Sequence, residues 1–414
     1  MTSTTFFVVG FFFKLEGLML LSLSYMLLLG LLLAYVFKLI KIPALIGFVL
    51  TGIILGPFVL NLIDASILDI SSELRTVALV VILLRAGLML RINELKENGL
   101  GALLLTFLPA TFEIMATLVF ATQFLNWSWI DAFMLGTILA AVSPAVIVPR
   151  MIDLIDNHIG QEHKVPQMVM AGASADDIFV ILLFSLSISF KQTDHFEPQS
   201  LIIFPFQIFI GIGLGLVIGF LLTKFFKQYH MRDTVKVLII LAISFLLLGF
   251  EKQFIEYSGL LAILSLGIMI LKDYEILAKR LLKKYEKIWV FAEMLLFILI
   301  GALLDLSTLK SVGLTAVLLI VFVLVIRSIG VVVSTSTTKL SLKEKTFVLI
   351  SYMPKATVQA SIGAIPLQMG FDKGPEILTV AVVSILFTAP IGAYLMDLFS
   401  HKLLINSSTE EDHS

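Results

Sequence analysis

Two adjacent carboxylates, Asp176 and Asp177, stand in the apolar stretch GASADDIFVI, residues 172–181. On a membrane-spanning helix they would lie about 11 to 12 residues from its start, roughly 17 Å deep and close to the midplane. An acid at that depth costs several kcal/mol unless it is paired or hydrated. Neighbours on a helix point about 100° apart, so both side chains can face one cavity without touching.

Burial and a nearby like charge both favour the protonated form of a carboxyl group. The aspartate pair can therefore hold either a proton or a small metal cation, but not both at once. That competition is the minimal chemistry needed to exchange cations for protons. The alternative is structural: two acids hydrogen-bonded to buried hydroxyl groups.

Glu113, in PATFEIMAT, and Arg327, in VLVIRSIGV, also carry charges inside apolar stretches, 214 residues apart. Opposite charges at related depths predict a buried ion pair, and loss of either partner would strand a charge. The role of this pair can be purely structural. In an alternative arrangement, Arg327 sits against Asp176 and is released when an ion binds.

The elements that position these charges are apolar helices. Of the 414 residues, 59% are hydrophobic and 14% are charged, against about 25% charged in a typical soluble protein. Apolar runs of 17 to 27 residues recur along the chain and predict an all-α polytopic membrane protein with about 13 transmembrane helices. The net charge of −1 gives no nucleic-acid footprint, and the absence of cysteine excludes disulfides, thiol catalysis and cysteine-ligated zinc.

The predicted spans are 17–40, 43–60, 74–90, 99–125, 128–149, 165–190, 201–226, 234–250, 255–271, 288–304, 312–338, 345–369 and 375–399. Residues 1–16 are apolar but contain Lys14 and Glu16, so they either lie on the membrane or begin the first helix. The polar tail, residues 401–414, is expected in the cytoplasm.

Lysine and arginine set the orientation of such a chain. With the N-terminus outside, 20 of the 29 fall in inside loops and 6 in outside loops, while Arg85, Arg327 and Lys355 remain within spans. We therefore expect an outside N-terminus and a cytoplasmic C-terminus, in the plasma (inner) membrane. The run LAKRLLKKYEK (277–287) is predicted to form an amphipathic inside loop against anionic lipid headgroups.

An internal repeat relates the two halves. SGLLAILSLGIMI (258–270) echoes IGFVLTGIILGPF (46–58) at an offset of 212 residues, and Gly301 follows Gly87 by 214. Spans one to six therefore match spans eight to thirteen, with span seven as a linker. Seven spans separate the copies and give them opposite orientations, which is the inverted-topology repeat of many secondary transporters.

Span five, LAAVSPAVIVP, and span twelve, SYMPKATVQASIG, each carry a proline in mid-span, Pro144 and Pro354. Proline removes a backbone donor and clashes with the preceding turn, so two crossed broken helices are predicted at matching positions. Lys355 would balance the partial negative charge of the helix ends that meet there. Neutral oxygens for a small cation, beside the carboxylates, would come from Ser143, Thr137 and Gln359.

Other polar residues receive structural interpretations. Arg85, near the inner end of span three, is expected to snorkel to the interface. Glu293 is expected to reach inside water, with a functional role as the less favoured alternative. His158 and His163, in DNHIGQEHKVP, are expected to be solvated loop residues rather than pH sensors.

Together, AAVSPAVIVPRM, GASADDIFVI, VILLRAGLML and YMPKATVQASIG resemble the cation:proton antiporter superfamily, and best fit its two-aspartate branch and the NHA sodium/proton antiporters. The resemblance covers about residues 40–395 and implies an NhaA-like antiporter fold. It implies that Asp177 is the principal carboxylate for Na⁺ and the proton, that Asp176 is its partner, and that Glu113 and Arg327 are the neighbouring charge pair. Many members of this branch have lysine where Arg327 stands, which puts in doubt any stoichiometry that needs this side chain to release a proton.

The resemblance also implies a homodimer whose core moves as an elevator past a dimer domain. The core would comprise residues 99–190 and 312–400. The dimer domain would comprise residues 1–90 and 234–304, and the linker helix residues 201–226.

We expect exchange of sodium or lithium for protons, with no cofactor beyond the transported ions. Potassium/proton exchange is the nearest alternative, because the sequence does not resolve cation size. An intramembrane aspartyl protease would need its two aspartates on separate helices, and no GxGD motif is present. An organic-anion carrier would want more basic residues than Arg327 and Lys355, and a channel is a further alternative.

Overall fold

The structure is a computed structural model and describes residues 19–90, 99–192, 200–251 and 257–404. The secondary-structure elements in these ranges are all helices: α2 (Met19–Leu39), α3 (Ala44–Leu55), α4 (Ala65–Asp69), α5 (Ser71–Met89), α7 (Gly99–Phe124), α8 (Trp129–Ala140), α9 (Pro144–Asp156), α10 (Val165–Gln192), α11 (Ser200–Gln228), α12 (Asp233–Gly249), α13 (Gly259–Asp273), α14 (Glu275–Ala302), α15 (Leu306–Ser336), α16 (Leu342–Ser351), α17 (Thr357–Ile362), α18 (Ile365–Gln368) and α19 (Gly374–Leu403). The expectations for residues 1–16 and for the tail beyond residue 404 lie outside the described residues.

The helices make this an all-helical membrane protein. Within the described residues, seven helical segments are long and apolar enough to cross a bilayer by length and composition. Large apolar side chains also stand exposed along the helices, for example Leu20, Phe209 and Leu314. Such side chains suit contact with lipid tails, because the backbone polar groups behind them are satisfied within each helix.

One predicted loop is wrong. The basic run 277–287 belongs to α14, a single helix of 28 residues. The buried residues of this part recur every three or four positions, at Leu277, Leu281, Tyr285 and Trp289, as on one face of a helix. Most of its basic residues are exposed. Burial of the apolar stripe therefore extends the helix through the charged run.

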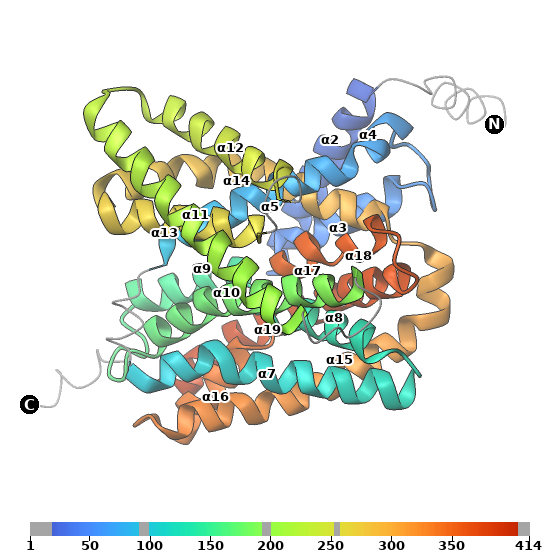
Figure 1. The fold of residues 1–414 in the computed structure, drawn as a ribbon. Helices are drawn as coiled ribbons and strands as arrows, with labels where there is room; N and C mark the ends of the chain where they lie inside the picture. The colour runs from blue at the N-terminus through green and yellow to red at the C-terminus, as the bar shows by residue number, and fades with distance from the viewer. Residues whose placement is uncertain (1–18, 91–98, 193–199, 252–256, 405–414) are drawn as a thin grey trace, which may run out of the picture.

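The helices form two groups (Figure 1). In that view α2, α3, α5, α12, α13 and α14 lie in the upper half, and α7, α8, α15, α16 and α19 lie in the lower half. In the upper group α3 packs on α14, and α5 packs on both α13 and α14. In the lower group α7 packs on α15, and α9, α10 and α17 pack against other members of this group. The long helix α11 packs on α13.

Two glycines let helices of the upper group touch at backbone distance. A Cβ at Gly301 of α14 would collide with the backbone of Val49 in α3, and one at Gly87 of α5 would collide with the backbone of Leu264 in α13. Gly87 and Gly301 are 214 positions apart, the spacing of the predicted repeat. A larger side chain at either position would force its helix pair apart.

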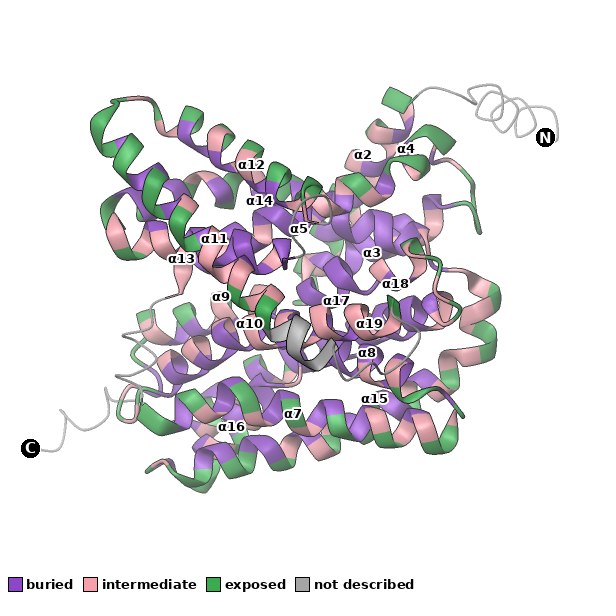
Figure 2. Cartoon of the chain, viewed as in Figure 1, coloured by how far each residue is buried: buried purple, intermediate pink, exposed green. Residues whose placement is uncertain are grey.

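Two paths through the lower group are interrupted midway, as the prolines predict. Residues 141–143 separate α8 from α9, and residues 352–356 separate α16 from α17. Pro144 is the first residue of α9, and Pro354 lies inside the second break. The breaks meet, because the Ser143 amide donates to the Pro354 carbonyl oxygen at 2.9 Å. Both breaks lie in the buried centre of the protein (Figure 2), where unwound backbone is tolerated in a membrane.

Candidate functional site

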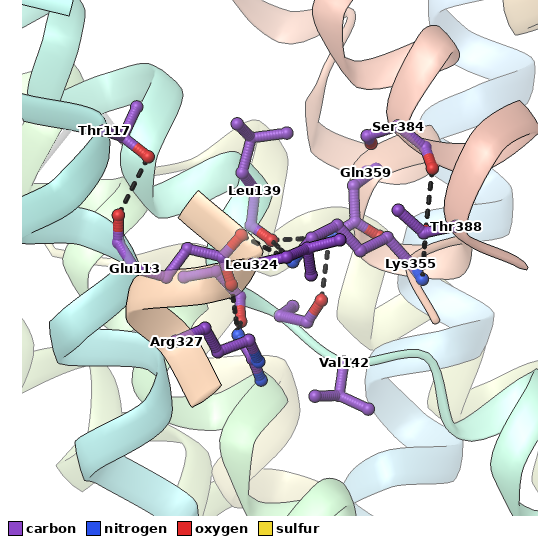
Figure 3. A network of polar contacts seen from close by, with 12 residues as sticks. Glu113, Thr117, Leu139, Val142, Leu324, Arg327, Lys355, Gln359, Ser384 and Thr388 are labelled. Carbon is purple, nitrogen blue, oxygen red and sulfur yellow. Dashed lines mark hydrogen bonds and ion pairs between the residues drawn. The ribbon is translucent and has the colours of Figure 1, made fainter. Parts of the chain in front are cut away.

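Glu113, midway along α7, is the centre of a buried network of charges (Figure 3). Arg327 of α15 donates from Nη1 to Oε2 of Glu113. The Nζ atom of Lys355 lies 2.6 Å from Oε1 of the same carboxylate. All three side chains are buried. The two partners predicted from the sequence are thus in contact, and Lys355 joins them.

The donors around this network also cap the end of α8. Arg327 donates to the backbone carbonyl oxygen of Ala140, and Lys355 donates to that of Leu139. Gln359 donates to the carbonyl oxygens of Ile138, Leu139 and Ala141. The last carbonyls of a helix carry partial negative charge, which these donors offset. Lys355 therefore lies at a helix end, where its charge balance is predicted to act. Gln359 uses its amide nitrogen, and its Oε1 has no hydrogen-bond partner among the described residues.

Asp176 turns into this network. Its Oδ2 accepts a hydrogen bond from the Val142 amide at 2.9 Å, in the break after α8. The same oxygen lies 3.5 Å from Nη2 of Arg327. Arg327 therefore contacts Glu113 and Asp176 together, so both arrangements considered for it from the sequence are present. The two acids and the two bases compensate one another.

Asp177 faces a cavity of about 230 Å³ instead. Its side chain is only 5% exposed, and its Oδ1 has no hydrogen-bond partner among the described residues. None of the ion pairs between buried side chains of the described residues includes it. The expectation that both aspartates can face one cavity is therefore met by Asp177 alone, because Asp176 points toward the break of α8.

The cavity lies between the two groups of helices. The lower group contributes Asp177 and Ser174 of α10, Pro144 of α9 and Thr357 of α17. The upper group contributes Arg85 of α5 and Trp289 and Glu293 of α14. Any relative movement of the two groups therefore changes what Asp177 faces.

On the wall opposite Asp177, Arg85 does not lie where the sequence predicts. The Arg85 guanidinium lies over the Trp289 ring, 5.1 Å from the ring centroid, and lines the cavity. Arg85 had been expected to snorkel to the interface. Glu293 lines the same space. Two residues with ionisable side chains, Arg85 and Glu293, thus line the wall opposite Asp177.

Asp177 also borders a second, much smaller space of about 10 Å³, lined by Leu79, Leu83, Ile181, Val358 and Ser361 among others. Its mostly apolar walls and small size offer little room to a hydrated ion. Of these two spaces beside Asp177, the cavity of about 230 Å³ is therefore the one that could admit an ion.

The predicted hydroxyl donors are buried but line neither of these two spaces. Thr137 donates its hydroxyl to the carbonyl oxygen of Met134 at 2.8 Å. The Oγ atom of Ser143 has no hydrogen-bond partner among the described residues. Ser174 and Thr357, which line the cavity, are not among the predicted residues. Their positions were the available signal, three residues before Asp177 and three residues after Pro354.

His163 is not the solvated loop residue that the sequence suggested. Its Nδ1 lies 2.9 Å from Oε1 of Glu344, a carboxylate with no exposed side-chain surface. Glu344 also forms a capping box with Ser341 at the start of α16. The contact ties the connection between α9 and α10 to the beginning of the second broken helix.

The fold and this site define a helical membrane transporter in which two interrupted helices meet at buried charges. The fold is similar to that of the sodium proton antiporter MjNhaP1 from Methanocaldococcus jannaschii, with a TM-score of 0.79. That match covers 93% of this chain and 99% of the other, at 21% sequence identity. At this identity the similarity shows the fold alone.

The chain belongs to the sodium/hydrogen exchanger family: the family model described as "Sodium/hydrogen exchanger, transmembrane" matches residues 4–397. Sodium/hydrogen exchanger 9B1 from Homo sapiens is 32% identical over 345 residues, which are 81% of this chain and 67% of the relative. Sodium/hydrogen exchanger 9B2 from Homo sapiens is 33% identical over 354 residues, 81% of this chain and 64% of the relative. The chain spans about two thirds of the length of these relatives. The family predicted from the motifs is confirmed, and it is a family of transporters rather than enzymes.

Proposed function

We propose that this chain exchanges sodium or lithium for protons, and that Asp177 binds either the cation or the proton. One observation carries the proposal. Asp177 is buried beside a cavity and forms no ion pair with any described residue, while the neighbouring charges of Asp176, Glu113, Arg327 and Lys355 compensate one another. A buried carboxylate without a counter-charge is stable only with a proton or a cation. Binding of one therefore excludes the other.

Oxygen atoms near the crossing support a small hard cation. Asp176 Oδ1, Ser143 Oγ and Gln359 Oε1 have no hydrogen-bond partner among the described residues. Thr137 donates its hydroxyl proton but keeps acceptor lone pairs. Small hard cations prefer carboxylate, carbonyl and hydroxyl oxygens, a rule stated for calcium and magnesium that we extend to sodium. In this proposal Asp176 is the partner of Asp177, and the three neutral side chains are further oxygen donors.

One cation for one proton is the exchange that the charges support. Arginine does not release its proton in proteins. Lys355 is held between Glu113 and the carbonyl oxygen of Leu139, each at 2.6 Å. Asp177 then remains as the site where the proton is exchanged. A cycle that carries one charge in each direction moves no net charge.

The transport step that we propose is an elevator movement of the lower group past the upper group. Residues 99–190 and 312–400 would form the moving core, and residues 1–90 and 234–304 the dimer domain, with 201–226 as a linker helix. The position of the cavity between the groups supports this division. In a chain of 13 spans with an inverted repeat, the same contacts can form on either side of the membrane. The close helix crossings at the repeat-related Gly87 and Gly301 agree with such a repeat.

The charge distribution supports an orientation in which the cavity opens to the cytoplasm. Met89 and Pro149 line the cavity and stand next to loops that the lysine and arginine asymmetry puts inside. We further propose a homodimer in the plasma (inner) membrane. The basic face of α14 would then lie against anionic lipid headgroups.

The test is exchange in liposomes that contain a pH-sensitive dye and carry an imposed proton gradient. Wild type, Asp177→Asn and the control Asp69→Asn, an exposed acid at the end of α4, would each receive sodium, lithium or potassium. We expect sodium or lithium to dissipate the gradient with wild type and the control, but not with Asp177→Asn. A response to potassium alone would keep the mechanism and replace the cation. If no monovalent cation moves protons, or if Asp177→Asn equals wild type, the proposal is wrong.

A further inference from the structure

Thr357 is the one buried threonine of the described residues whose hydroxyl is free. Nine threonines are buried. Eight of them donate to a backbone carbonyl oxygen three or four residues earlier in the chain. Thr357, only 2% exposed, has no hydrogen-bond partner among the described residues. A buried hydroxyl without a partner costs free energy and calls for a ligand.

The break in the second interrupted helix explains why this hydroxyl is free. Thr357 is the first residue of α17, and residues 352–356 before it are not helical. The carbonyl groups of Met353 and Pro354, which a helix would place beside its hydroxyl, are therefore not in helical positions. The same interruption that lets the two broken helices meet thus releases an oxygen close to their crossing.

Thr357 belongs to the wall of the cavity that Asp177 faces. It lines this cavity from α17, and Asp177 and Ser174 line it from α10. Ser174 stands three residues before Asp177 and so shares its helix face. One aspartate and two residues that bear hydroxyl groups, from two helices, thus line a single space. Carboxylate and hydroxyl oxygens are the types that a small hard cation takes as ligands.

We propose that the Thr357 hydroxyl is a ligand of the transported cation and sets the preference for sodium and lithium over potassium. The proposal rests on the exchange proposed above for Asp177. A larger cation needs longer distances to its oxygen ligands. Thr357 and Asp177 belong to different helices in a close-packed interior, so their oxygens cannot separate without disturbing the packing of α17 against its neighbours. Potassium therefore keeps fewer of these contacts than sodium does.

The position of Thr357 also predicts on which sides of the membrane it acts. Thr357 and Asp177 both belong to the proposed moving core, whereas Glu293 belongs to the opposite wall. A ligand that travels with the ion affects cation affinity from both sides. A residue of the stationary wall affects it only from the side on which the cavity is open.

The experiment compares the isosteric Thr357→Val with Thr357→Ser, which keeps the hydroxyl, in the liposome assay. Thr106→Val is the matched control, because Thr106 is equally buried at 2% and donates its hydroxyl to the carbonyl oxygen of Ala102. We expect Thr357→Val to raise the sodium concentration for half-maximal exchange about tenfold on both sides, with the maximal rate retained. The preference for sodium over potassium falls in the same variant. Thr357→Ser and Thr106→Val behave as wild type does.

A second measurement needs no transport. Sodium raises the thermal unfolding temperature of wild type and Thr357→Ser in detergent, because a bound ligand stabilises the folded state. Thr357→Val shows a smaller shift at the same sodium concentration, while its unfolding temperature without sodium does not fall. If wild type exchanges sodium and Thr357→Val keeps its half-maximal concentration, its selectivity and its thermal shift, the role of Thr357 is overturned and the exchange at Asp177 stands. If wild type exchanges no monovalent cation for protons, both proposals fall together.

Discussion

Asp176 and Asp177 are joined by one peptide bond and yet meet different surroundings. Asp176 accepts a hydrogen bond from the Val142 amide at 2.9 Å and lies 3.5 Å from Arg327. Asp177 lines the cavity, and its Oδ1 has no hydrogen-bond partner among the described residues. The helix turn between them thus separates a carboxylate held by a backbone amide and an arginine from one that lines the cavity.

Asp176→Asn should lower stability more than Asp177→Asn. Loss of the Asp176 charge leaves the network with one excess positive charge and weakens the bond to the Val142 amide. We expect a loss of about 2 kcal/mol in the free energy of unfolding. Asp177→Asn removes an uncompensated buried acid and should cost little. Thermal unfolding in detergent measures both, and equal losses would mean that the two aspartates share one environment.

Glu113→Gln should be more damaging than either aspartate variant. It strands Arg327 and Lys355 without their shared carboxylate, and breaking a buried ion pair in this way costs about 3–5 kcal/mol. The double variant Glu113→Gln with Lys355→Gln restores the balance of charge and should recover part of that loss. A double-mutant cycle on unfolding temperatures measures the coupling. Additive effects of the two substitutions would contradict the network.

Exchange by wild type should not respond to membrane potential. Arg327 keeps its charge through the cycle, and Asp177 carries either one proton or one monovalent cation. Initial rates in liposomes with a potassium diffusion potential, set by valinomycin, would check this. The expected rates with sodium are equal at zero potential and at an imposed potential. A rate that rises with potential would show that a second group, with Lys355 the first to examine, releases a proton.

Glu293→Gln should weaken cation binding from one side only. Glu293 lines the open cavity from α14 and adds a negative charge on the route to Asp177. We expect its removal to raise the half-maximal sodium concentration a few-fold on the cavity side, an effect that salt reduces. The control is Glu275→Gln, which makes the same change at the other end of α14. Equal changes on both sides would place Glu293 with the moving core.

The contact between His163 and Glu344 should make stability depend on pH. Burial alone would raise the pKa of the Glu344 carboxyl, but hydrogen bonds from His163 and Ser341 outweigh it and hold the pKa below its ordinary value of 4.5. A carboxyl whose pKa is lowered by folding stabilises the protein fully above its ordinary pKa. That contribution is lost as the pH falls through the lowered pKa.

Glu344→Gln should therefore lower the unfolding temperature at pH 7, by the equivalent of about 1–2 kcal/mol. The difference from wild type should shrink as the pH falls below 4.5. Glu376→Gln, an acid in the first turn of α19 that pairs with Lys373, is a matched control. A difference that stays constant from pH 7 down to acid would show that the charge of Glu344 is not what stabilises the start of α16.

Much of this molecule follows from local patterns of residues. Apolar length predicts the helices, because a bilayer requires each span to satisfy its own backbone. Pro144 and Pro354 mark the two breaks, because proline lacks a backbone donor and clashes with the preceding turn. Proline alone does not decide a break, since Pro109 and Pro390 lie inside the continuous helices α7 and α19. The pairing of Glu113 with Arg327 could be predicted because opposite charges buried at related depths stabilise each other when they are in contact. The loop predicted at 277–287 is wrong. The buried apolar stripe continues through the charged run and keeps it helical as part of α14.

The sequence by itself therefore determined which segments form apolar helices and where along each helix the charged residues lie. Only the tertiary structure decided which way each side chain faces. The rotation of α10 against α8 and α15 sends Asp176 to Val142 and Arg327 and leaves Asp177 at the cavity. The placement of α17 brings Thr357 to the same cavity from a position 180 residues further along the chain. These contacts depend on how separate helices pack, and the spacing of residues along one helix carries no information about that.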